Sequence, residues 1–494
     1  MFCKELKETR AVPYKLLSYF LSLLISLLLS GCPAVGPDYA RPETPVGDEF
    51  ANKSAPFSAL SQTDIAWWKQ FDDDKLNRII TLTLAHNYDL KAALANIREA
   101  RAQYVEAALD FLPTVTSHAN YTMQQRSYSS LGSSKGIAPT NLNLYNTGFD
   151  MAWELDIFGR IRRNVESRDA DIEVVEAQAR DVMVSVIGEA ARNYFELRGY
   201  QNQLAVAQKN AENQAKTFEI TQLMLEGGRG TELDTSRAEA QMKTTQAIVP
   251  PLDTAIRKAI HRLSILTGQL PDALTEQLAV PQAIPRHPDV LNIGNPTELL
   301  RRRPDIQAAE RTLASSTARV GVAVADLFPR LFFNGVMSLE AGALMGLGSA
   351  GSTAYSLGPS LRWEFLNIGR VHARIVGAEA HAEANLARYQ QVVLNALEET
   401  ENALVNYRNL RIRMEQLKLA ASDSLEATEL ARLRYREGVS DFLNLLDAER
   451  RLLEDQDRLA NSQTSAAAAL ATLYKALGGG WEVDEKAIKE YDHL

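Results

Sequence analysis

The stretch YNTGFDMAWELDIFGR, residues 145–160, has a second version, YSLGPSLRWEFLNIGR, at residues 355–370. In both, apolar or aromatic residues alternate with polar or small ones, which predicts a β-strand with one apolar and one polar face. The segments 115–123 and 331–341 alternate more weakly. Each segment has about 9–12 residues, the length of a tilted transmembrane strand. A half-buried sheet of a soluble domain alternates in the same way, so the pattern alone leaves both interpretations open.

The two stretches belong to an internal duplication of the chain. Trp153-Glu154 precedes Trp363-Glu364 by 210 positions, and the same offset relates Gly228 to Gly438. Upstream of the strands, an offset of 216 relates the segment 87–93 to 303–309. Two copies indicate duplication of one structural unit, because a solenoid would need more repeats.

Each copy is predicted to begin with a helix and to continue, after two strands, with a much longer one. The opening helices, 73–110 and 296–326, each stop near a proline, Pro113 or Pro329. The long runs 159–226 and 369–437 contain no strong helix breaker, and at 1.5 Å per residue each would be roughly 100 Å long.

The second long run carries a narrow stripe of apolar and small residues at spacings of three and four, as in coiled-coil packing. A glycine-containing turn ends each long run, and a return helix then leads to Gly268 or Gly478. The first return helix contains Pro250-Pro251, which we expect to kink it. The stripe consists of Ile375, Ala378, Ala382, Leu386, Tyr389, Val393, Ala396, Thr400, Leu404 and Tyr407.

The N-terminus is predicted to be a bacterial lipoprotein signal. Four basic residues precede the apolar stretch 16–30, which is shorter than the roughly 20 residues of a membrane-spanning helix. The sequence Leu29-Ser30-Gly31-Cys32 then resembles a lipobox, in which Cys32 becomes the lipidated N-terminus. The alternative is an ordinary signal peptide followed by a chance cysteine. A signal and an anchor favour the membrane interpretation of the strands, which would then face outer-membrane lipid.

Composition excludes several function classes. The 494-residue chain has a formal net charge of −9, which argues against a nucleic-acid partner. After the signal no apolar run reaches 18 residues, so no transmembrane helix is expected. No catalytic motif occurs, and His372 and His381 lack metal-ligand spacing. We therefore expect no enzyme activity, no catalytic residue, no metal site and no cofactor.

The predicted strands require further copies of the chain. Four strands cannot close a barrel, and an open edge in lipid leaves costly unpaired backbone groups. Two copies would give eight strands and three would give twelve, and the residues alone do not decide the number. Strands at one end and helical hairpin tips about 100 Å away would form a duct that crosses the outer membrane and much of the periplasm.

Five segments resemble the outer-membrane factor (TolC-like) family, lipoprotein branch of proton-driven efflux systems. They are residues 29–32, 35–39, 298–306, 434–439 and 474–481. The resemblance covers essentially the whole mature chain, and the triple arginine before Pro304 is its most specific part. It implies a membrane α/β fold: a homotrimer whose 12-stranded transmembrane β-barrel, four strands per chain, continues as a long α-helical periplasmic barrel. It also implies two partners, a periplasmic adaptor protein and an inner-membrane, proton-driven transporter.

The resemblance also implies where the channel closes and where it meets the adaptor. Leu443, Asp447 and Arg450 match the family's gate positions and share one helix face. Three Asp447 carboxylates around an axis would repel unless paired with Arg450 or with a cation. An ordinary exposed ion pair between these two side chains is the alternative. The adaptor-contacting tips would include Gly227, Gly228, Gly230, Thr231, Gly438, Val439 and Ser440, although the first tip is more glycine-rich and more basic than is usual in the family.

These observations predict a domain order and a function. The order is a signal peptide (1–31), a lipid-anchored equatorial segment (32–72), a first repeat (73–280), a linker (281–295), a second repeat (296–480) and a C-terminal tail (481–494) without assigned role. The predicted function is a passive exit duct of a tripartite efflux pump, with an iris-like periplasmic gate. The alternatives are a channel for type I secretion or metal export, and a periplasmic coiled-coil scaffold lipoprotein without a pore.

Overall fold

The computed structural model describes residues 34–53, 57–58, 66–125, 141–286 and 291–484. The predicted lipidation residue Cys32 and most of the tail lie outside these ranges. The chain divides into two compact units, the first drawn from residues 1–42, 99–173 and 310–387 and the second from 43–98, 174–309 and 388–494. Each copy of the duplicated sequence contributes to both units, so the units do not follow the repeats.

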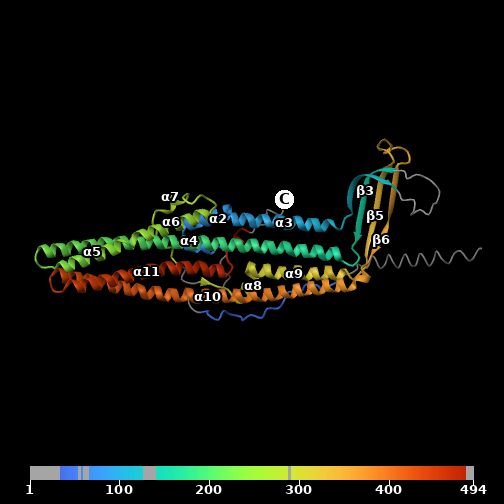
Figure 1. Ribbon diagram of the computed structural model, residues 1–494. Coiled ribbons are helices and arrows are strands. Elements are labelled where there is room, and N and C mark those ends of the chain that lie inside the picture. The colour runs from blue at the N-terminus through green and yellow to red at the C-terminus, as the bar shows by residue number, and fades with distance from the viewer. Residues whose placement is uncertain (1–33, 54–56, 59–65, 126–140, 287–290, 485–494) are drawn as a thin grey trace, which may run out of the picture. The chain divides into compact units, whose positions relative to one another are not determined.

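The two copies have the same order of elements (Figure 1). The first copy contains α2 (Asp74–His86), α3 (Tyr88–Leu109), β2 (Thr114–Gln125), β3 (Asn141–Leu155), α4 (Arg160–Glu226), α5 (Glu232–Gln246) and α6 (Val249–Leu266). The second copy contains α8 (Pro296–Arg302), α9 (Pro304–Ala325), β5 (Arg330–Ala341), β6 (Thr353–Arg362), α10 (Ile368–Arg436) and α11 (Phe442–Ala476). Shorter elements are β1 (Phe57–Ser58), which pairs in parallel with β4 (Leu291–Asn292), η1 (Trp67–Phe71), α7 (Thr275–Leu278), η3 (Leu344–Gly346), η4 (Phe365–Asn367) and η5 (Trp481–Asp484).

Each opening helix is broken once, where the sequence predicted a single helix. In the first copy Asn87 is extended, and its Oδ1 accepts hydrogen bonds from the backbone N–H groups of Asp89 and Leu90, which caps α3. Its Nδ2 donates to the carbonyl oxygen of Leu266, the last residue of α6, at 3.0 Å. Asn87 therefore joins the end of the return helix to the start of α3.

The second copy has an equivalent break at Arg303. The following Pro304 disfavours helical geometry at Arg303, whose backbone is extended. Its guanidinium donates to the carbonyl oxygen of Ala476, the last residue of α11, at 2.8 Å, and pairs with Asp305 at the start of α9. We call these two contacts the Asn87 joint and the Arg303 joint.

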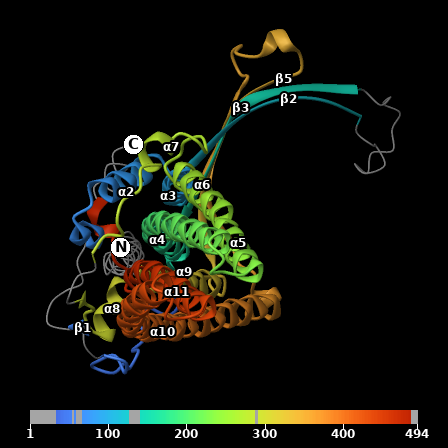
Figure 2. The ribbon, with the colours of Figure 1, turned by 90° about the vertical axis from the view of Figure 1, so that its left-hand side faces the viewer.

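The first unit contains the four-stranded sheet, with the order β2-β3-β5-β6 and antiparallel pairing throughout. Figure 2 shows that the sheet is strongly curved. The register places Ser117, Phe149, Met337 and Tyr355 side by side across the strands, so the face predicted to be apolar is continuous. β2 and β6 are the two edges of this sheet.

The strands differ from their predicted bounds at the ends. β3 begins at Asn141, before the alternation starts, because it pairs with β2 as far as Gln125. β6 ends at Arg362, because the residues that follow turn through η4 into α10. At this end of the sheet the indole N–H of Trp153 donates to the carbonyl oxygen of Phe111, and that of Trp363 to Leu327. These two contacts are equivalent in the duplication.

The second unit holds the main hydrophobic core, which η1 enters with Trp67. The ring of Trp67 is fully buried and stacks on Tyr474 of α11 at a centroid distance of 4.7 Å. Phe71 packs on Phe195 of α4 at 4.9 Å. Aliphatic side chains of α2, α6 and α10 complete the core, so residues 67–71 tie helices of both copies together.

The long helices follow the prediction closely. α4 has 67 residues and α10 has 69, and in the second unit α5 lies beside α4 while α11 lies beside α10 (Figures 1 and 2). The first return helix is interrupted between α5 and α6, with prolines in the first turn of α6. Among the described helices, none is long and apolar enough to cross a membrane. The stripe of α10 is buried in the second unit at Tyr389, Val393, Ala396, Thr400, Leu404 and Tyr407.

Candidate functional site

The first hairpin tip connects α4 to α5 through the predicted glycine turn. Gly227 donates to the carbonyl oxygen of Leu223 and thus still closes a helical turn. Gly228 then has φ +68°, the left-handed conformation that ends many helices. Gly230 donates to the carbonyl oxygen of Met224, and the Thr231 hydroxyl caps α5 by accepting from the backbone N–H of Asp234. The four predicted tip residues therefore belong to one turn, with Arg229 between Gly228 and Gly230.

The second tip, between α10 and α11, repeats this geometry. Gly438 has φ +74°, Val439 donates to the carbonyl oxygen of Arg434, and the Ser440 hydroxyl accepts from Asn444. A Cβ atom added at Gly438 would lie 2.9 Å from a terminal nitrogen of Arg229. The basic residue that makes the first tip unusual therefore packs against the second tip, which brings the two tips together.

The predicted gate residues lie on the exposed face of α11, directly after the second tip. Leu443 is 51% exposed, and Asp447 and Arg450 are also exposed. Arg450 donates through Nε to the side-chain oxygen of Gln241 on α5, at 3.0 Å. Arg450 therefore forms its side-chain hydrogen bond with the other hairpin and not with Asp447. Leu233, the counterpart of Leu443 in the first copy, is 57% exposed.

The opposite face of α11 carries a residue that the sequence did not single out. The Glu449 side chain is 2% exposed and accepts hydrogen bonds from Thr217 (2.7 Å) and Gln214 (3.1 Å) of α4. Arg432 of α10 forms an ion pair with it at 2.9 Å. One carboxylate therefore joins three helices beside the predicted gate. The duplication repeats this glutamate as Glu239 in the first copy, but Glu239 is exposed, so the repeat alone does not mark Glu449 as buried.

An aromatic cluster supports the second tip from within. Tyr435 of α10 lies against Phe442 of α11 at a centroid distance of 5.6 Å. Burial, and to a lesser degree the nearby Asp234 carboxylate, raises the pKa of the Tyr435 phenol. This side chain stays neutral at physiological pH and acts as part of the packing beneath the tip.

The sheet has a polar face opposite its apolar one. On it His118 contacts the Asp150 carboxylate (2.6 Å) and the Asn146 side-chain oxygen (2.5 Å), and Asn146 donates to Glu340 (2.9 Å). This row of hydrogen bonds links β2, β3 and β5. On the other face Phe149, Met337 and Tyr355 are 60%, 62% and 84% exposed.

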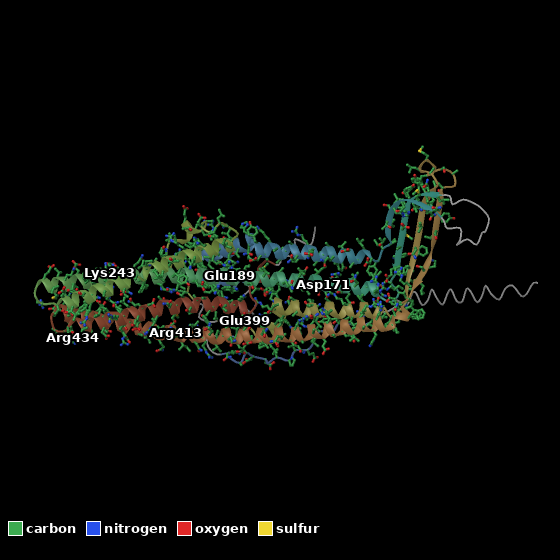
Figure 3. All side chains as sticks on the ribbon, in the orientation of Figure 1. Asp171, Glu189, Lys243, Glu399, Arg413 and Arg434 are labelled. Carbon is green, nitrogen blue, oxygen red and sulfur yellow. The ribbon has the colours of Figure 1, made fainter. Side chains whose placement is uncertain are left out.

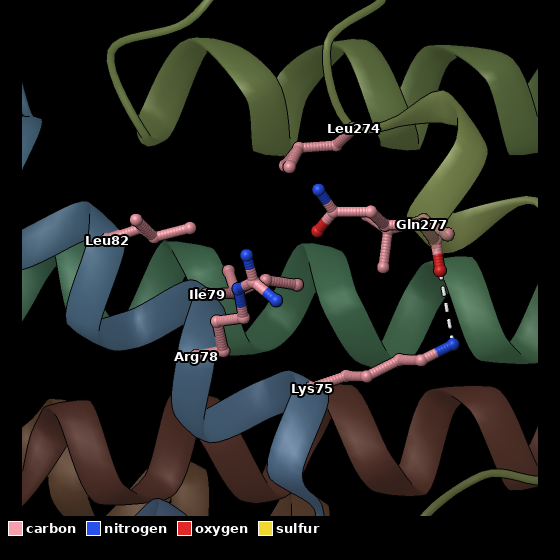
Figure 4. Close-up of a pocket in the computed structure, with 7 residues that line it drawn as sticks. Lys75, Arg78, Ile79, Leu82, Leu274 and Gln277 are labelled. Carbon is pink, nitrogen blue, oxygen red and sulfur yellow. Dashed lines mark hydrogen bonds between the residues drawn. The ribbon is translucent and has the colours of Figure 1, made fainter.

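The structure also contains small pockets. One pocket, with a volume of about 220 Å³, lies between α2 and the α6–α7 region (Figure 4). The Lys75 ammonium group at the edge of this pocket donates a hydrogen bond to the backbone carbonyl oxygen of Gln277. This contact joins α2 to α7 within the fold. In the part of the chain that the structure describes, no group of three or more His, Cys, Asp or Glu residues could hold a metal ion. The pocket is lined by Lys75, Arg78, Ile79, Leu82, Leu274, Gln277 and Leu278.

Charged side chains cover the helices outside these clusters (Figure 3). Glu399 of α10, labelled there, pairs with the guanidinium of the Arg303 joint at 2.8 Å. Asp181 of α4 belongs to the same charged cluster. Burial, with a contribution from Asp305, raises the pKa of the Asp181 carboxyl. This cluster stabilises the connection between α8 and α9.

Known proteins match this architecture over nearly the whole chain. The sequence profile described as "Outer membrane efflux protein" matches residues 79–269 and 295–479. The chain belongs to the outer membrane efflux protein family. Nodulation protein T of Rhizobium leguminosarum bv. trifolii is 33% identical over 94% of this chain and 97% of that protein.

Solved structures of the family show the same fold. The structure of the outer-membrane channel OprN superposes with a TM-score of 0.84 at 43% identity, covering 91% of this chain and 99% of that one. Among the sequence relatives, the cation efflux system protein CusC of Escherichia coli is 29% identical over 95% of this chain and 99% of that protein. The chain therefore has the TolC-like fold and is an outer-membrane efflux channel protein, as the sequence predicted.

Proposed function

We propose that three copies of this chain form the exit duct of a tripartite efflux pump. The observation that carries the proposal is the sheet: it has one aromatic apolar face, one polar face and two open edges, β2 and β6. Unpaired edges are costly in lipid, so the sheets of neighbouring copies would pair edge to edge, twelve strands in all. The apolar faces would then meet lipid and the polar row around His118 would line the lumen.

The proposal includes an anchor and two partners. Cys32 would be lipidated and would hold the protein in the outer membrane, since several acyl chains together bind a membrane firmly. The two contacting tips, with the exposed side chain of Val439, would dock on a periplasmic adaptor. The adaptor would connect the duct to an inner-membrane, proton-driven transporter. The chain itself would be a passive conduit without catalysis.

The gate is proposed at Leu443, Asp447 and Arg450. Three exposed Asp447 side chains around the axis would narrow the opening and repel one another, and the Arg450–Gln241 bond would hold α11 against α5. Opening would require this bond to break. The buried Glu449 would keep the rest of the hairpin in place.

The test is single-channel conductance of purified protein in planar bilayers. We expect a small or flickering conductance for the wild type and a larger one for Asp447→Ala with Arg450→Ala, because the variant removes both the charge ring and the bond to α5. The control is Arg451→Ala with Asp457→Ala, which removes the same types of charge from exposed positions of the same helix. An unchanged conductance in the first variant would remove the gate, and an inserted oligomer without any conductance would remove the duct.

Metal export is the second candidate function, because the relative CusC is named a cation efflux protein. Deletion of this chain from its host would distinguish the two. Sensitivity to organic compounds would favour the general duct, and sensitivity to metal cations alone would favour the metal exporter.

A further inference from the structure

The first described residues, 34–41, lie against the start of α4, and we call them the strap. The backbone N–H of Val35 donates to the carbonyl oxygen of Phe158 at 3.1 Å. The ring of Phe158 stacks on Phe328 at a centroid distance of 4.6 Å. These residues lie where β3 passes into α4 and just before β5 begins. The strap is thus fixed at the end of the sheet that connects to the helices.

Arg163 of α4 grips the backbone of the strap. Its side chain is 4% exposed, and its guanidinium donates to the carbonyl oxygens of Ala34 (3.4 Å), Val35 (3.1 Å) and Gly36 (3.3 Å). It also pairs with Asp38 (2.7 Å) and with Glu166 (2.8 Å). Bonds to three successive carbonyl oxygens hold a chain segment in one path, whatever its side chains.

Close backbone contacts fix the same segment. Gly36 has φ +92°, and a Cβ atom there would lie 2.4 Å from the Cα of Gly321 on α9. A Cβ atom on Gly159 would lie 2.6 Å from the Cα of Ala34. Real Cβ contacts are essentially never this short, so the strap touches α9 and the residue just before α4 backbone to backbone.

The far end of the strap is also attached. The Tyr39 hydroxyl donates to Glu310 of α9 at 2.8 Å, and the guanidinium of Arg311 lies 5.3 Å from the centre of the Tyr39 ring. Arg41 lies 3.7 Å from the Glu310 carboxylate. Both ends of the strap are therefore held in the first unit by specific contacts.

Two tryptophans mark the level at which the strap begins. Trp153 and Trp363 are 36% and 51% exposed, and each donates its indole N–H to a turn carbonyl at the same end of the sheet. Exposed tryptophans at the end of an apolar strand face are typical of the membrane–water interface. Gly159, which touches Ala34, follows Trp153 by six positions.

We infer that the strap delivers the lipid of Cys32 into the leaflet at the level of Trp153 and Trp363, with Arg163 as the positioning residue. Cys32 precedes Ala34 by two positions, a span of at most about 7 Å. The acyl chains and the apolar sheet face therefore enter the same phospholipid leaflet side by side. This inference rests on the lipidation in the proposed function and adds the residue that directs it.

The experiment compares Arg163→Met with Arg319→Met in the purified full-length protein. Arg319 pairs with Asp171 between the same two helices and lies outside the strap contacts, so it is the matched control. Hydrogen exchange of the backbone amides of 34–41 reports whether the strap is docked. Loss of a buried, charge-assisted grip is expected to lower their protection by about tenfold or more in Arg163→Met only.

A second measurement separates positioning from general stability. Each variant is also made in an unlipidated form, with an ordinary signal peptide and Cys32→Ser, and the yield of outer-membrane trimer is measured. We expect Arg163→Met to reduce the yield several-fold in the lipidated protein and to have no further effect in the unlipidated one. If Arg163→Met fails to accumulate, Arg163→Lys keeps the charge without the planar fork and serves in its place.

Three results would overturn the inference, and they are distinguishable. Normal exchange protection in Arg163→Met would show that the grip does not hold the strap. Equal losses of trimer in both lipid forms would reduce Arg163 to an ordinary stabilising residue. A wild-type N-terminal peptide whose mass carries no lipid would instead remove the proposed anchor itself.

Discussion

Glu449 shows at the scale of a residue how one carboxylate holds the helices behind the proposed gate. Its donors come from α4 and α10, while the gate residues of α11 point the other way. Removing the carboxylate would leave the Thr217 hydroxyl and the Gln214 amide without their acceptor in a buried place. Buried donors without partners are costly, so this side chain should matter more than its exposed neighbours.

Glu449→Ala is therefore expected to lower the free energy of unfolding by about 2–3 kcal/mol. The measurement is denaturation of the purified protein, followed by circular dichroism. The control is Glu454→Ala, an exposed residue of the same helix, which should change stability by less than about 0.5 kcal/mol. Equal effects of the two substitutions would contradict the assigned role.

Asp181 gives a prediction of pH dependence. Its carboxyl has a raised pKa in the folded protein, chiefly through burial and then through Asp305. A raised pKa means that the folded state binds the proton more tightly, so ionisation destabilises the fold as the pH rises above about 4, the usual value of an aspartate. Asp181→Asn should therefore raise the melting temperature at pH 7.5, and this gain should shrink toward pH 4.

The control for Asp181 is Asp423→Asn, an exposed residue of α10. We expect its melting temperature to follow the wild type across the same pH range. A gain for Asp181→Asn that is independent of pH would mean that the amide packs better, and the titration argument would fail.

At the scale of elements, the Asn87 joint connects the end of α6 to the start of α3, and the Arg303 joint connects the end of α11 to the start of α9. Each joint lets a short return helix stack on a short opening helix, and both use a side chain that reaches a terminal carbonyl. The side chains differ between the copies, an amide in one and a guanidinium in the other. The duplication has thus kept the contact without keeping the residue.

Asn87→Ala should cost about 2 kcal/mol, because it removes a helix cap and the bond to Leu266. Asn87→Ser keeps the capping oxygen and lacks the amide donor, so it should cost about half as much. Thermal unfolding measures both, with Asn461→Ala, an exposed asparagine that bonds only within its own helix, as the control. If Asn87→Ser lowered the stability as much as Asn87→Ala does, the whole effect would come from the hydrogen bond to the Leu266 carbonyl oxygen.

Local patterns predicted the elements better than the contacts between them. The absence of breakers from 159 to 226 gave α4, the alternation from 145 to 156 gave most of β3, and the glycines gave both tips. Asn87 was missed as a break because it looks like an interior helix residue until the Leu266 carbonyl is beside it. The grip of Arg163 on Asp38 was also missed, since 125 positions separate the two residues.

At the scale of the whole molecule, the two open edges of the sheet predict how copies meet. Val115 of β2 and Leu361 of β6 are 59% and 63% exposed on the apolar face near the same end of the sheet. Val115→Cys combined with Leu357→Cys or Leu361→Cys should give disulfide-linked species of up to three chains on oxidation. In a closed ring of sheets the two edges belong to neighbouring chains.

The matched control is Phe149→Cys with Met337→Cys, which lie opposite each other on the inner strands β3 and β5 of one chain. These cysteines should link only within a chain. Non-reducing gels of membrane-extracted protein separate the outcomes. Monomers alone from every edge pair, with the control intact, would contradict pairing of β2 with β6.

The two joints also bear on the ancestry of the chain. In each copy the last residue of the return helix lies within hydrogen-bond distance of the residue at the break of the opening helix, so the end of a copy lies close to a residue near its beginning. A unit with neighbouring ends can be doubled in a gene with only a short connector, because neither copy has to rearrange. A single copy contributes two strands and one long hairpin. With the three copies proposed above, six such half-length units would supply the same twelve strands.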